Sequence, residues 1–376
     1  MMITNGAHTG NGASRPVGLY IHIPFCVKKC NYCDFCSKAP VSSDFDRYFD
    51  RLSDELSVYR RTPKISVDTV FIGGGTPSLL PVGYFTRLFK MVHEVFDIKA
   101  DAEITTEINP GTLTRQKALE YRSVGINRAS LGLQSIHENE LKSLGRIHSF
   151  DDFLSAYGIL RDVGFDNISV DLMYGIPEQT QKSLEKTLDT VIGLAPEHIS
   201  LYGLIIEEDT PFGRTWQSLQ IPTEDEECDM YYLACDRLGR AGYSHYEISN
   251  YHRDGHACRH NLKYWNTDEY IGIGAAAHSF FAGKRFGNTR DLFDIIRDPN
   301  ADDESGADEY VMMRLRLSAG LSLSEYRERF GTDFLSDRGE KLSILRSCGL
   351  VELDGERLYL TERGFYVSNS IIAELI

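Results

Sequence analysis

Four of the eight cysteines lie close together in the chain, at Cys26, Cys30, Cys33 and Cys36. Lysine, asparagine and aspartate residues stand between them, so the four side chains cannot all face an apolar core. Thiolates packed this densely are typical ligands of iron–sulfur clusters or of zinc. The run therefore predicts a metal site near the start of the chain.

Three kinds of metal site compete for this run. With Cys36 as a fourth thiolate, the run suits a ferredoxin-type [4Fe–4S] cluster and a plain electron carrier. A structural zinc site usually takes two separated cysteine pairs, and no second pair exists here. The remaining cysteines are scattered: Cys228, Cys235, Cys258 and Cys348. A third site uses only the first three thiolates, which leaves one iron open to a small ligand. The spacing favours iron–sulfur chemistry, and the rest of the chain must decide whether one iron is open.

Composition excludes several classes of protein. The chain has 376 residues and a net charge of −15, which argues against a nucleic-acid partner because no basic stripe offsets it. Residues 1–16 are rich in Gly, Asn, Ser and Thr, lack the apolar core of a signal peptide and are expected to form a disordered lead. No apolar run approaches the length of a membrane span. Clustered cysteines in a chain of this length indicate a reducing compartment, and we expect the cytoplasm.

From residue 17 the chain alternates short apolar runs with longer amphipathic stretches. The apolar runs predict six strands, at 17–23, 67–72, 103–108, 129–133, 168–173 and 198–206. The amphipathic stretches predict helices at 44–60, 81–96, 114–124, 138–144, 150–163, 183–192 and 224–238. Strand–helix units in succession imply a parallel sheet with right-handed crossovers.

Polar residues mark the same end of these strands. The cysteine run follows the first strand, Gly73–Gly75 follows the second, and Glu107 ends the third. Gln134 follows the fourth strand, and Asp171 lies near the end of the fifth. A barrel collects its site from the carboxyl ends of all strands, whereas an open sheet concentrates its site at one switch point. The pattern favours an α/β fold with a partial (β/α)6 barrel over residues 17–242.

The last third of the chain departs from this alternation. Residues 243–297 form an extension with unusual His, Cys and Trp content, and an acidic linker at 298–309 marks a boundary. Residues 298–376 predict a small winged-helix-like domain with helices at 310–318, 323–330 and 336–348 and a hairpin around Asp354-Gly355. The domain is not basic enough to favour DNA, so a packing or docking role is the better interpretation.

Small-ligand chemistry is suggested by the polar residues at the strand ends. The glycines of Gly73-Gly74-Gly75-Thr76-Pro77 allow close backbone approach to a ligand, although a tight turn would explain them too. Glu107 and Asp171 suit ribose hydroxyls or an ammonium group, and Arg146 suits a carboxylate. Each taken alone is more often a surface or capping residue, and it is their shared placement that favours a ligand site.

A second candidate site is the segment His260-Asn261-Leu262-Lys263-Tyr264-Trp265. Histidine is a common axial ligand of haem iron, and Tyr264 and Trp265 offer flat faces for a macrocycle. Three nearby cations suit haem propionates: Arg253, Arg259 and Lys263. The alternative is a structural aromatic turn in which His260 is hydrogen-bonded to backbone. In an extended segment His256, Cys258 and His260 would share one face, which makes Cys258 a competing iron ligand.

These motifs resemble those of radical-SAM proteins of the coproporphyrinogen oxidase-like branch, from about Val17 to the C-terminus. The resemblance is carried by the sequences YIHIPFC at 20–26, GGGTP at 73–77, EINP at 107–110, GLQS at 132–135, LGR at 144–146 and DLMYGIP at 171–177. It implies that Cys26, Cys30 and Cys33 hold a [4Fe–4S] cluster whose open iron binds S-adenosylmethionine. It also implies an S-adenosylmethionine site formed by Tyr20, Tyr32, Gly74, Gly75, Thr76, Glu107, Gln134, Arg146, Asp171 and Ile205.

Within this branch, H-N-x-x-Y-W resembles the haem-binding motif that separates HemW-type haem chaperones from the true oxidases. The short polar lead points the same way. The resemblance implies haem held through His260 beside Tyr264 and Trp265, and delivery to haem-accepting respiratory proteins. It is compatible with peripheral membrane contact through those acceptors and with a homodimer. The alternative is an enzyme that decarboxylates coproporphyrinogen III through a 5′-deoxyadenosyl radical. Cys36 and Cys258 depart from the pattern of the family.

Overall fold

The computed structural model describes residues 15–298, 303–304, 306–336 and 338–376. The predicted disordered lead at 1–16 lies outside these residues except for its last two positions. Six neighbouring parallel strands form the centre of the fold: β1 (Val17–Ile23), β2 (Ile65–Gly74), β3 (Phe96–Ile108), β4 (Arg128–Gln134), β5 (Ile168–Tyr174) and β6 (His198–Gly203). The predicted α/β class and the six parallel units are confirmed.

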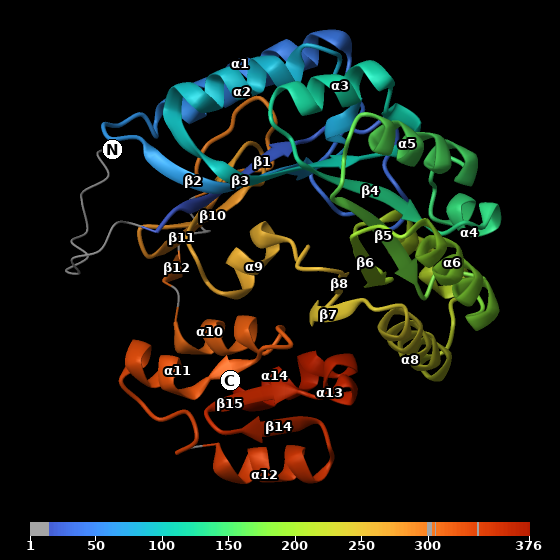
Figure 1. Cartoon of the computed structure of the whole chain (residues 1–376), viewed down its shortest axis with the longest axis vertical. Coiled ribbons are helices and arrows are strands. Elements are labelled where there is room, and N and C mark those ends of the chain that lie inside the picture. Colours follow the sequence, from blue (N-terminus) through green and yellow to red (C-terminus); the bar gives the residue numbers. More distant parts are fainter. Residues whose placement is uncertain (1–14, 299–302, 305, 337) are drawn as a thin grey trace.

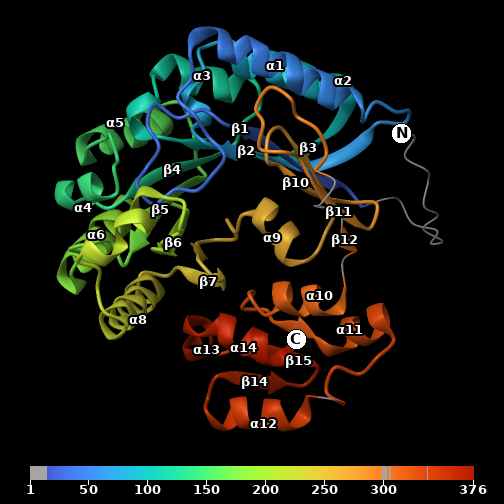
Figure 2. The same ribbon diagram turned by 180° about the vertical axis from the view of Figure 1, so that it is seen from behind.

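Helices cover the convex face of this sheet (Figure 1; Figure 2). They are α1 (Ser42–Ser57), α2 (Tyr84–Val95), α3 (Arg115–Ser123), α4 (Glu138–Ser143), α5 (Phe150–Asp162), α6 (Gln181–Leu194) and α8 (Glu224–Arg240). α1 buries Tyr48, Leu52 and Leu56 at helical spacing, because one face of an amphipathic helix packs on the sheet. Ser149 and Thr180 are the N-cap residues that precede α5 and α6, and each side chain accepts a hydrogen bond from an amide of the first turn.

Several predicted element ends differ from those observed, and two of the differences concern residues that gain a partner elsewhere. The predicted helix to residue 96 ends at Val95, because Phe96 begins β3 and pairs with Ile65. Strand pairing outweighs the helical pattern here, because it satisfies the backbone groups of both chains. The sixth strand ends at Gly203 rather than at residue 206. Leu204 leaves the strand, and its amide donates to the Tyr174 carbonyl at 2.9 Å.

The sheet extends well beyond the six predicted strands. Short strands from the 243–304 region join both edges: β7 (Ser244–Glu247), β8 (Asn250–His252), β9 (Tyr270–Ile273), β10 (His278–Phe281), β11 (Lys284–Gly287) and β12 (Asp303–Glu304). β9 pairs in parallel with β1, and β8 pairs antiparallel with β6, which gives a twelve-stranded sheet. The predicted division between 242 and 243 stays a prediction, but the extension shares one sheet with the barrel.

The helix α9 (Arg259–Trp265) lies on the concave side of the sheet, opposite α1, α2 and α3 (Figure 2). It packs against β2, where the ring of His260 stacks on that of Phe71 with centroids 5.4 Å apart. The segment predicted to bind haem therefore lies inside the curve of the barrel. The helix begins at Arg259, so the extended alternation considered for residues 256–260 does not reach His260.

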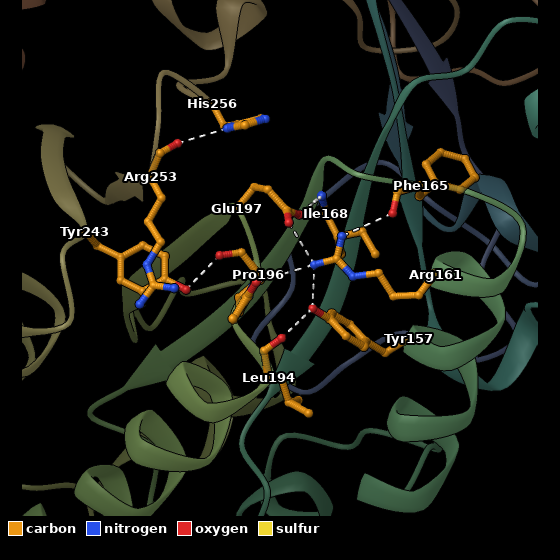
Figure 3. Close-up of polar contacts among 11 residues, drawn as sticks. Tyr157, Arg161, Phe165, Ile168, Leu194, Pro196, Glu197, Tyr243, Arg253 and His256 are labelled. Carbon is orange, nitrogen blue, oxygen red and sulfur yellow. Dashed lines mark hydrogen bonds and ion pairs between the residues drawn. The ribbon is translucent and has the colours of Figure 1, made fainter.

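A polar cluster joins β8 to β5 and β6 (Figure 3). The Arg161 guanidinium donates to the Tyr157 hydroxyl at 2.7 Å and to the Glu197 carboxylate at 3.0 Å. The second carboxylate oxygen of Glu197 accepts from the Ile168 amide at 2.9 Å, and its carbonyl accepts from the Arg253 amide at 2.9 Å. The pair is largely buried, which makes its hydrogen bonds stronger than those of a surface pair.

We expect Glu197→Ala to lower the free energy of unfolding by about 1–3 kcal/mol, because it leaves the Ile168 amide and the Arg161 guanidinium short of an acceptor. Urea denaturation followed by circular dichroism measures the loss. Asp162→Ala is the matched control, since it breaks the exposed pair with Arg115 and should cost at most about 0.5 kcal/mol. Equal losses in the two variants would contradict a special role for the cluster.

The C-terminal part forms a separate small layer below the barrel (Figure 1). It contains α10 (Ala307–Arg314), α11 (Leu323–Phe330), α12 (Gly339–Ser347) and a hairpin of β14 (Val351–Asp354) and β15 (Arg357–Leu360), in the predicted order. The sequence did not predict β13 (Leu321–Ser322), α13 (Glu362–Tyr366) or α14 (Ser368–Leu375). The boundary at 298 stays a prediction. In the described residues, we find no helix with both the length and the apolar character needed to cross a membrane.

Candidate cluster and cofactor site

The cysteine run forms a loop after β1 that is held by main-chain hydrogen bonds at several points. The Cys26 amide donates to the Lys38 carbonyl at 3.0 Å, and the Lys38 amide donates to Pro24 at 2.9 Å. Further along, the Asn31 amide donates to Leu144 at 2.9 Å, while its side-chain amide donates to the Ser143 carbonyl at 2.8 Å. These bonds fix the loop to the end of α4, which brings the cysteines beside Arg146.

The first three cysteines of the run form one group, and Cys36 stands apart from it. Cys26 accepts a hydrogen bond from the Thr76 hydroxyl at 3.5 Å, and Cys30 accepts one from the Arg146 guanidinium at 3.6 Å. Burial and the neighbouring Cys30 and Cys26 thiolates raise the pKa of Cys33 to about 11. Cys36 is buried, and its thiol donates to the Arg290 carbonyl at 3.3 Å.

The three thiols suit a cluster better than a single metal ion. Within the described part of the chain, no three His, Cys, Asp or Glu side chains converge on one ion position. In a cubane each thiolate binds a different iron, so the sulfurs need not converge on one point. All eight cysteines, which lie among the described residues, are free thiols. The donor set therefore fits an iron–sulfur cluster held by Cys26, Cys30 and Cys33.

The glycine run is packed too tightly for any other residue. A Cβ on Gly74 would lie 2.4 Å from the His22 ring, and the φ of Gly74 is +111°. A Cβ on Gly75 would lie 2.8 Å from the Phe25 backbone. The amides here are already bonded: Gly74 to the Glu107 carboxylate at 3.0 Å, Gly75 to Ile23 at 2.9 Å. An ammonium group only donates, so any backbone partners for it here must be carbonyl oxygens.

Two partly buried carboxylates lie near the end of β3 and in the middle of β5. Burial, followed by the charge of Asp171, raises the pKa of Glu107 to about 7, although the hydrogen bond from Gly74 opposes the shift. Burial also raises the pKa of Asp171, whose carboxylate accepts from the Ser130 hydroxyl at 2.9 Å and from the Ser169 hydroxyl at 3.3 Å. Asp171 lies inside β5 rather than at its end, so its hydrogen-bonding capacity is largely taken by the protein.

The side chains of Gln134 and Arg146 both lie next to Gly132, and each has a buried polar atom without a hydrogen-bond partner among the described residues. Gln134 ends β4 with a φ of +66°, a backbone conformation rare outside glycine. The Arg146 guanidinium donates to the Gly132 carbonyl at 3.2 Å. Among the described residues, neither the buried Gln134 Oε1 nor the buried Arg146 Nε has a hydrogen-bond partner. Buried polar atoms are rarely left unpaired, so a ligand that donates to Gln134 and accepts from Arg146 fits here.

The three other predicted residues lie in different surroundings. The Tyr20 hydroxyl is hydrogen-bonded to His22 Nδ1 at 2.9 Å, and burial raises the pKa of Tyr20. Tyr32 packs at a small apolar cluster with Leu144, and burial raises its pKa also. Ile205 is 70% exposed in the loop after β6, so it contacts a ligand only if the ligand reaches that edge.

A cavity of about 400 Å³ opens beside this group. Its walls are Tyr20, His22, Asp34, Phe35, Cys36, Gly74, Glu107, Ala276, His278, Asn288, Arg290 and Asp298. Sequence reasoning predicted only Tyr20, Gly74 and Glu107 among these as ligand-binding residues. The others come from β1, from the cysteine loop and from residues 276–298, and no motif in the chain connects the cysteine loop with residues 276–298.

The buried face of α9 is held by hydrogen bonds within the protein. The Glu103 carboxylate accepts from the amides of Arg259 and His260, each at 3.0 Å, and from the Cys258 thiol at 3.5 Å. His260 Nδ1 pairs with the Thr69 hydroxyl at 2.9 Å, and its Nε2 pairs with the Tyr264 hydroxyl at 2.8 Å. Burial, then the Lys263 charge, lowers the pKa of His260 to about 3. Neutral His260 therefore has both ring nitrogens engaged.

The cations expected to bind propionates are engaged as well. Lys263 pairs with Asp68 at 2.9 Å, and Arg259 lies 3.9 Å from the same carboxylate. The Arg253 guanidinium donates to the Ala241 carbonyl. That these cations face haem propionates stays a prediction, in which they would also keep or exchange these partners. Trp265 ends α9, with the Arg316 guanidinium 5.8 Å from its ring.

Comparisons with known proteins show which families this chain is similar to. Residues 20–191 match the model of the radical SAM superfamily, and residues 303–367 match that of the HemN C-terminal domain. The heme chaperone HemW of Bacillus subtilis is 33% identical over 372 residues, which cover 95% of this chain and 98% of that protein. The heme chaperone HemW of Escherichia coli is 40% identical over 70% of each chain.

A solved structure shares the fold. The structure of coproporphyrinogen III oxidase, HemN, from Escherichia coli superposes with a TM-score of 0.81 over 96% of this chain and 90% of that one. The two are 22% identical, so this likeness concerns the fold alone. The two sequence relatives above are named heme chaperones rather than oxidases. The chain belongs to the radical-SAM family of HemW heme chaperones.

Proposed function

We propose that this protein is a cytoplasmic haem chaperone, which binds haem together with a [4Fe–4S] cluster and S-adenosylmethionine and passes the haem to respiratory apoproteins. The supporting observation is the similarity to proteins named heme chaperone over nearly the whole chain. Eight free thiols are consistent with a reducing compartment. The net charge of −15 argues against a nucleic-acid partner, because nucleic acids are negatively charged as well.

Each part of the site has a role under this proposal. Cys26, Cys30 and Cys33 would hold the cluster, which supplies an electron and leaves one iron for S-adenosylmethionine. Arg146 would bind the carboxylate of that ligand, and the unpaired Gln134 Oε1 would accept from a ribose hydroxyl. The remaining residues proposed to line the site are Tyr20, Tyr32, Gly74, Gly75, Thr76, Glu107, Asp171 and Ile205.

The H-N-x-x-Y-W motif lies inside the barrel, and this placement supports the proposal of a haem site. His260 stacks on Phe71, and Phe71 stacks on Tyr20, which lines the cavity. Tyr264 holds the second nitrogen of His260. Direct ligation of iron by His260 stays a prediction, because it requires one of these two hydrogen bonds to break.

The test is anaerobic reconstitution of the cluster, then haem titration and transfer to an apo-cytochrome, all in one preparation. We expect stoichiometric haem binding and transfer to the acceptor. Absence of haem binding would overturn the proposal. Formation of protoporphyrinogen from coproporphyrinogen III at catalytic yield would assign the chain to oxidase chemistry instead.

The affinity for S-adenosylmethionine should depend on pH through Glu107. Because the pKa of Glu107 lies near 7 in the folded chain, its carboxyl is protonated at lower pH. An ammonium or hydroxyl donor favours the ionised form, so binding releases that proton. The apparent affinity should therefore fall as the pH drops below 7, by up to about tenfold per unit.

Isothermal titration from about pH 5.5 to about pH 8, on cluster-loaded protein, would measure this slope on both sides of the Glu107 pKa of about 7. Glu107→Gln carries no titrating carboxyl and should flatten the profile below pH 7. Asp171, whose pKa is also raised, stays in place in this variant. A slope unchanged in Glu107→Gln would assign the proton to another group.

A further inference from the structure

A chain of hydrogen bonds joins Asp171, in the proposed S-adenosylmethionine site, to the residue that precedes α9. The Ser169 hydroxyl lies 3.3 Å from an Asp171 carboxylate oxygen and 2.8 Å from His198 Nδ1. His198 Nε2 lies 2.9 Å from the Tyr246 hydroxyl, and that hydroxyl accepts from the Cys258 amide at 3.2 Å. Because α9 carries the H-N-x-x-Y-W motif, the chain connects the two candidate sites of this protein.

The links beyond the carboxylate are shielded from water. Ser169, His198 and Cys258 are fully buried, and Tyr246 is 8% exposed. Strand pairing holds the first link in place, since Ser169 of β5 is paired with His198 of β6. Burial, followed by the charge of Arg128, keeps the pKa of His198 well below its ordinary value, so its ring is neutral. A neutral imidazole has one donor and one acceptor nitrogen, and the chain therefore has a direction.

The two ends of the chain favour one direction. A carboxylate only accepts, so the Ser169 hydroxyl donates to Asp171 and accepts from the Nδ1–H group of His198. Nε2 then accepts from the Tyr246 hydroxyl, and every proton of the chain has an acceptor. In the reverse state Ser169 donates to Nδ1, and the Nε2–H group donates to the Tyr246 oxygen. The hydroxyl proton of Tyr246 then has no acceptor among the described residues, so the reverse state is less stable without a ligand.

A ligand hydroxyl that donates to Asp171 shifts the balance between the two states. The carboxylate already accepts from Ser130 at 2.9 Å and from Ser169 at 3.3 Å, and the longer bond is the first to give way. The released Ser169 hydroxyl donates to His198, while its oxygen can accept from Ser200, 3.3 Å away. One proton leaves Nδ1 and one arrives at Nε2, by exchange with water during local opening, so the ring stays neutral.

The reverse state weakens the anchor of α9. The Tyr246 oxygen then accepts from Nε2 as well as from the Cys258 amide, and the two donors compete for it. Cys258 is the N-cap residue of α9, and its amide hydrogen bond fixes the chain where it enters the helix. Ligation of iron by His260 requires a buried hydrogen bond of its ring to break. A looser start of α9 makes that change easier.

We propose that S-adenosylmethionine at Asp171 and the haem motif on α9 are coupled through this chain, with His198 as the positioning residue whose protonated nitrogen switches. Occupation of the first site loosens the start of α9 and strengthens haem binding. By thermodynamic reciprocity, haem strengthens the binding of S-adenosylmethionine by the same factor. The inference rests on the proposed function and adds a route of regulation between its two sites.

Hydrogen exchange of the Cys258 amide tests the coupling on the full chain, with its cluster reconstituted and left oxidised so that the ligand stays intact. Saturating S-adenosylmethionine should speed this exchange about fivefold or more in the wild type, the lower end of common coupling strengths. Tyr246→Phe keeps the ring but removes the hydroxyl between His198 and Cys258. This variant should still bind the ligand, without any change in the exchange.

Haem titration with and without S-adenosylmethionine gives the second readout. The ligand should raise the haem affinity of the wild type by about fivefold or more and should leave that of Tyr246→Phe unchanged. Tyr121→Phe is the matched control, because it removes a buried hydroxyl on α3 that has no hydrogen-bond partner among the described residues. It should behave as the wild type in both measurements.

The outcomes separate the inference from the proposed function. Because the exchange measurement needs no haem, a wild type that binds S-adenosylmethionine but no haem would sink the chaperone proposal, and the exchange would still decide on the chain. Exchange that is unchanged or slower with the ligand bound overturns the inference alone. Equal acceleration in Tyr246→Phe also overturns it, because the coupling then acts through space, as the buried charge of Arg128 would allow. If melting curves show Tyr246→Phe unfolded, Ser169→Ala cuts the chain at its other end and should abolish the response in the same way.

Discussion

Cys26→Ala, Cys30→Ala and Cys33→Ala should each lose the iron–sulfur cluster, while Cys36→Ala should keep it. The Cys26 and Cys30 sulfurs accept hydrogen bonds from Thr76 and Arg146, and both lie close enough to Cys33 to raise its pKa. The Cys36 thiol, in contrast, is buried and donates to the Arg290 carbonyl. With two thiolates left, a cubane has two open irons and is expected to decompose. With Cys36 removed, the three thiolates remain and one iron stays open to a small ligand.

Iron and sulfide analysis after anaerobic reconstitution measures this, together with the absorbance of the cluster. The Cys36→Ala protein should hold about four irons per chain, as a [4Fe–4S] cluster requires. Cys348→Ala is the control for removal of a thiol, because Cys348 is exposed and lies in the C-terminal part. If Cys36→Ala loses the cluster and S-adenosylmethionine leaves the wild-type spectrum unchanged, four-thiolate ligation and an electron carrier become the better description.

Glu103→Ala should be strongly destabilising and should loosen the start of α9. The carboxylate of Glu103 accepts from two backbone amides and from the Cys258 thiol, and it is 7% exposed. Its charge also favours the buried Arg128 guanidinium. Removal leaves buried donors without an acceptor, and we expect the free energy of unfolding to fall by about 3–5 kcal/mol.

Urea denaturation measures the stability, and hydrogen exchange at the amides of Arg259 and His260 reports on α9 directly. Exchange there should be faster in Glu103→Ala by more than the global loss of stability explains. Glu94→Ala is the matched control, because it removes an exposed carboxylate that pairs with Arg60 and should cost at most about 0.5 kcal/mol. Protection of the α9 amides as in the wild type would show that Glu103 does not hold the helix.

Much of the barrel could be predicted because its signals are local. Each of the six strands is a short apolar run, and each is followed by residues with helical spacing. The order of the strands then follows from right-handed crossovers, which bring the carboxyl ends to one edge. For this reason Gln134 and Arg146 could be expected in one site, and the structure brings both to Gly132.

The added strands could not be predicted in the same way. β7 to β12 contain two to four residues each, too few for a period-two pattern to stand out. They exist because the edges of β1 and β6 offer unpaired backbone groups, which these segments satisfy. The cavity wall that carries His278 and Arg290 therefore depends on long-range pairing rather than on local composition.

The sequence by itself determined the chemistry of the cysteine run, the parallel barrel and the family, since residue type and spacing carry that information. Only the tertiary structure decided which side chains are still available. His260 is a plausible iron ligand as a residue type, but Thr69, which is distant in sequence, and Tyr264 occupy its two nitrogens. His278 belongs to no motif in the sequence, yet folding places it in the lining of the cavity. Folding brings partners close to a side chain, and these partners occupy its hydrogen-bond donors and acceptors. Whether the side chain can bind a ligand therefore depends on the fold.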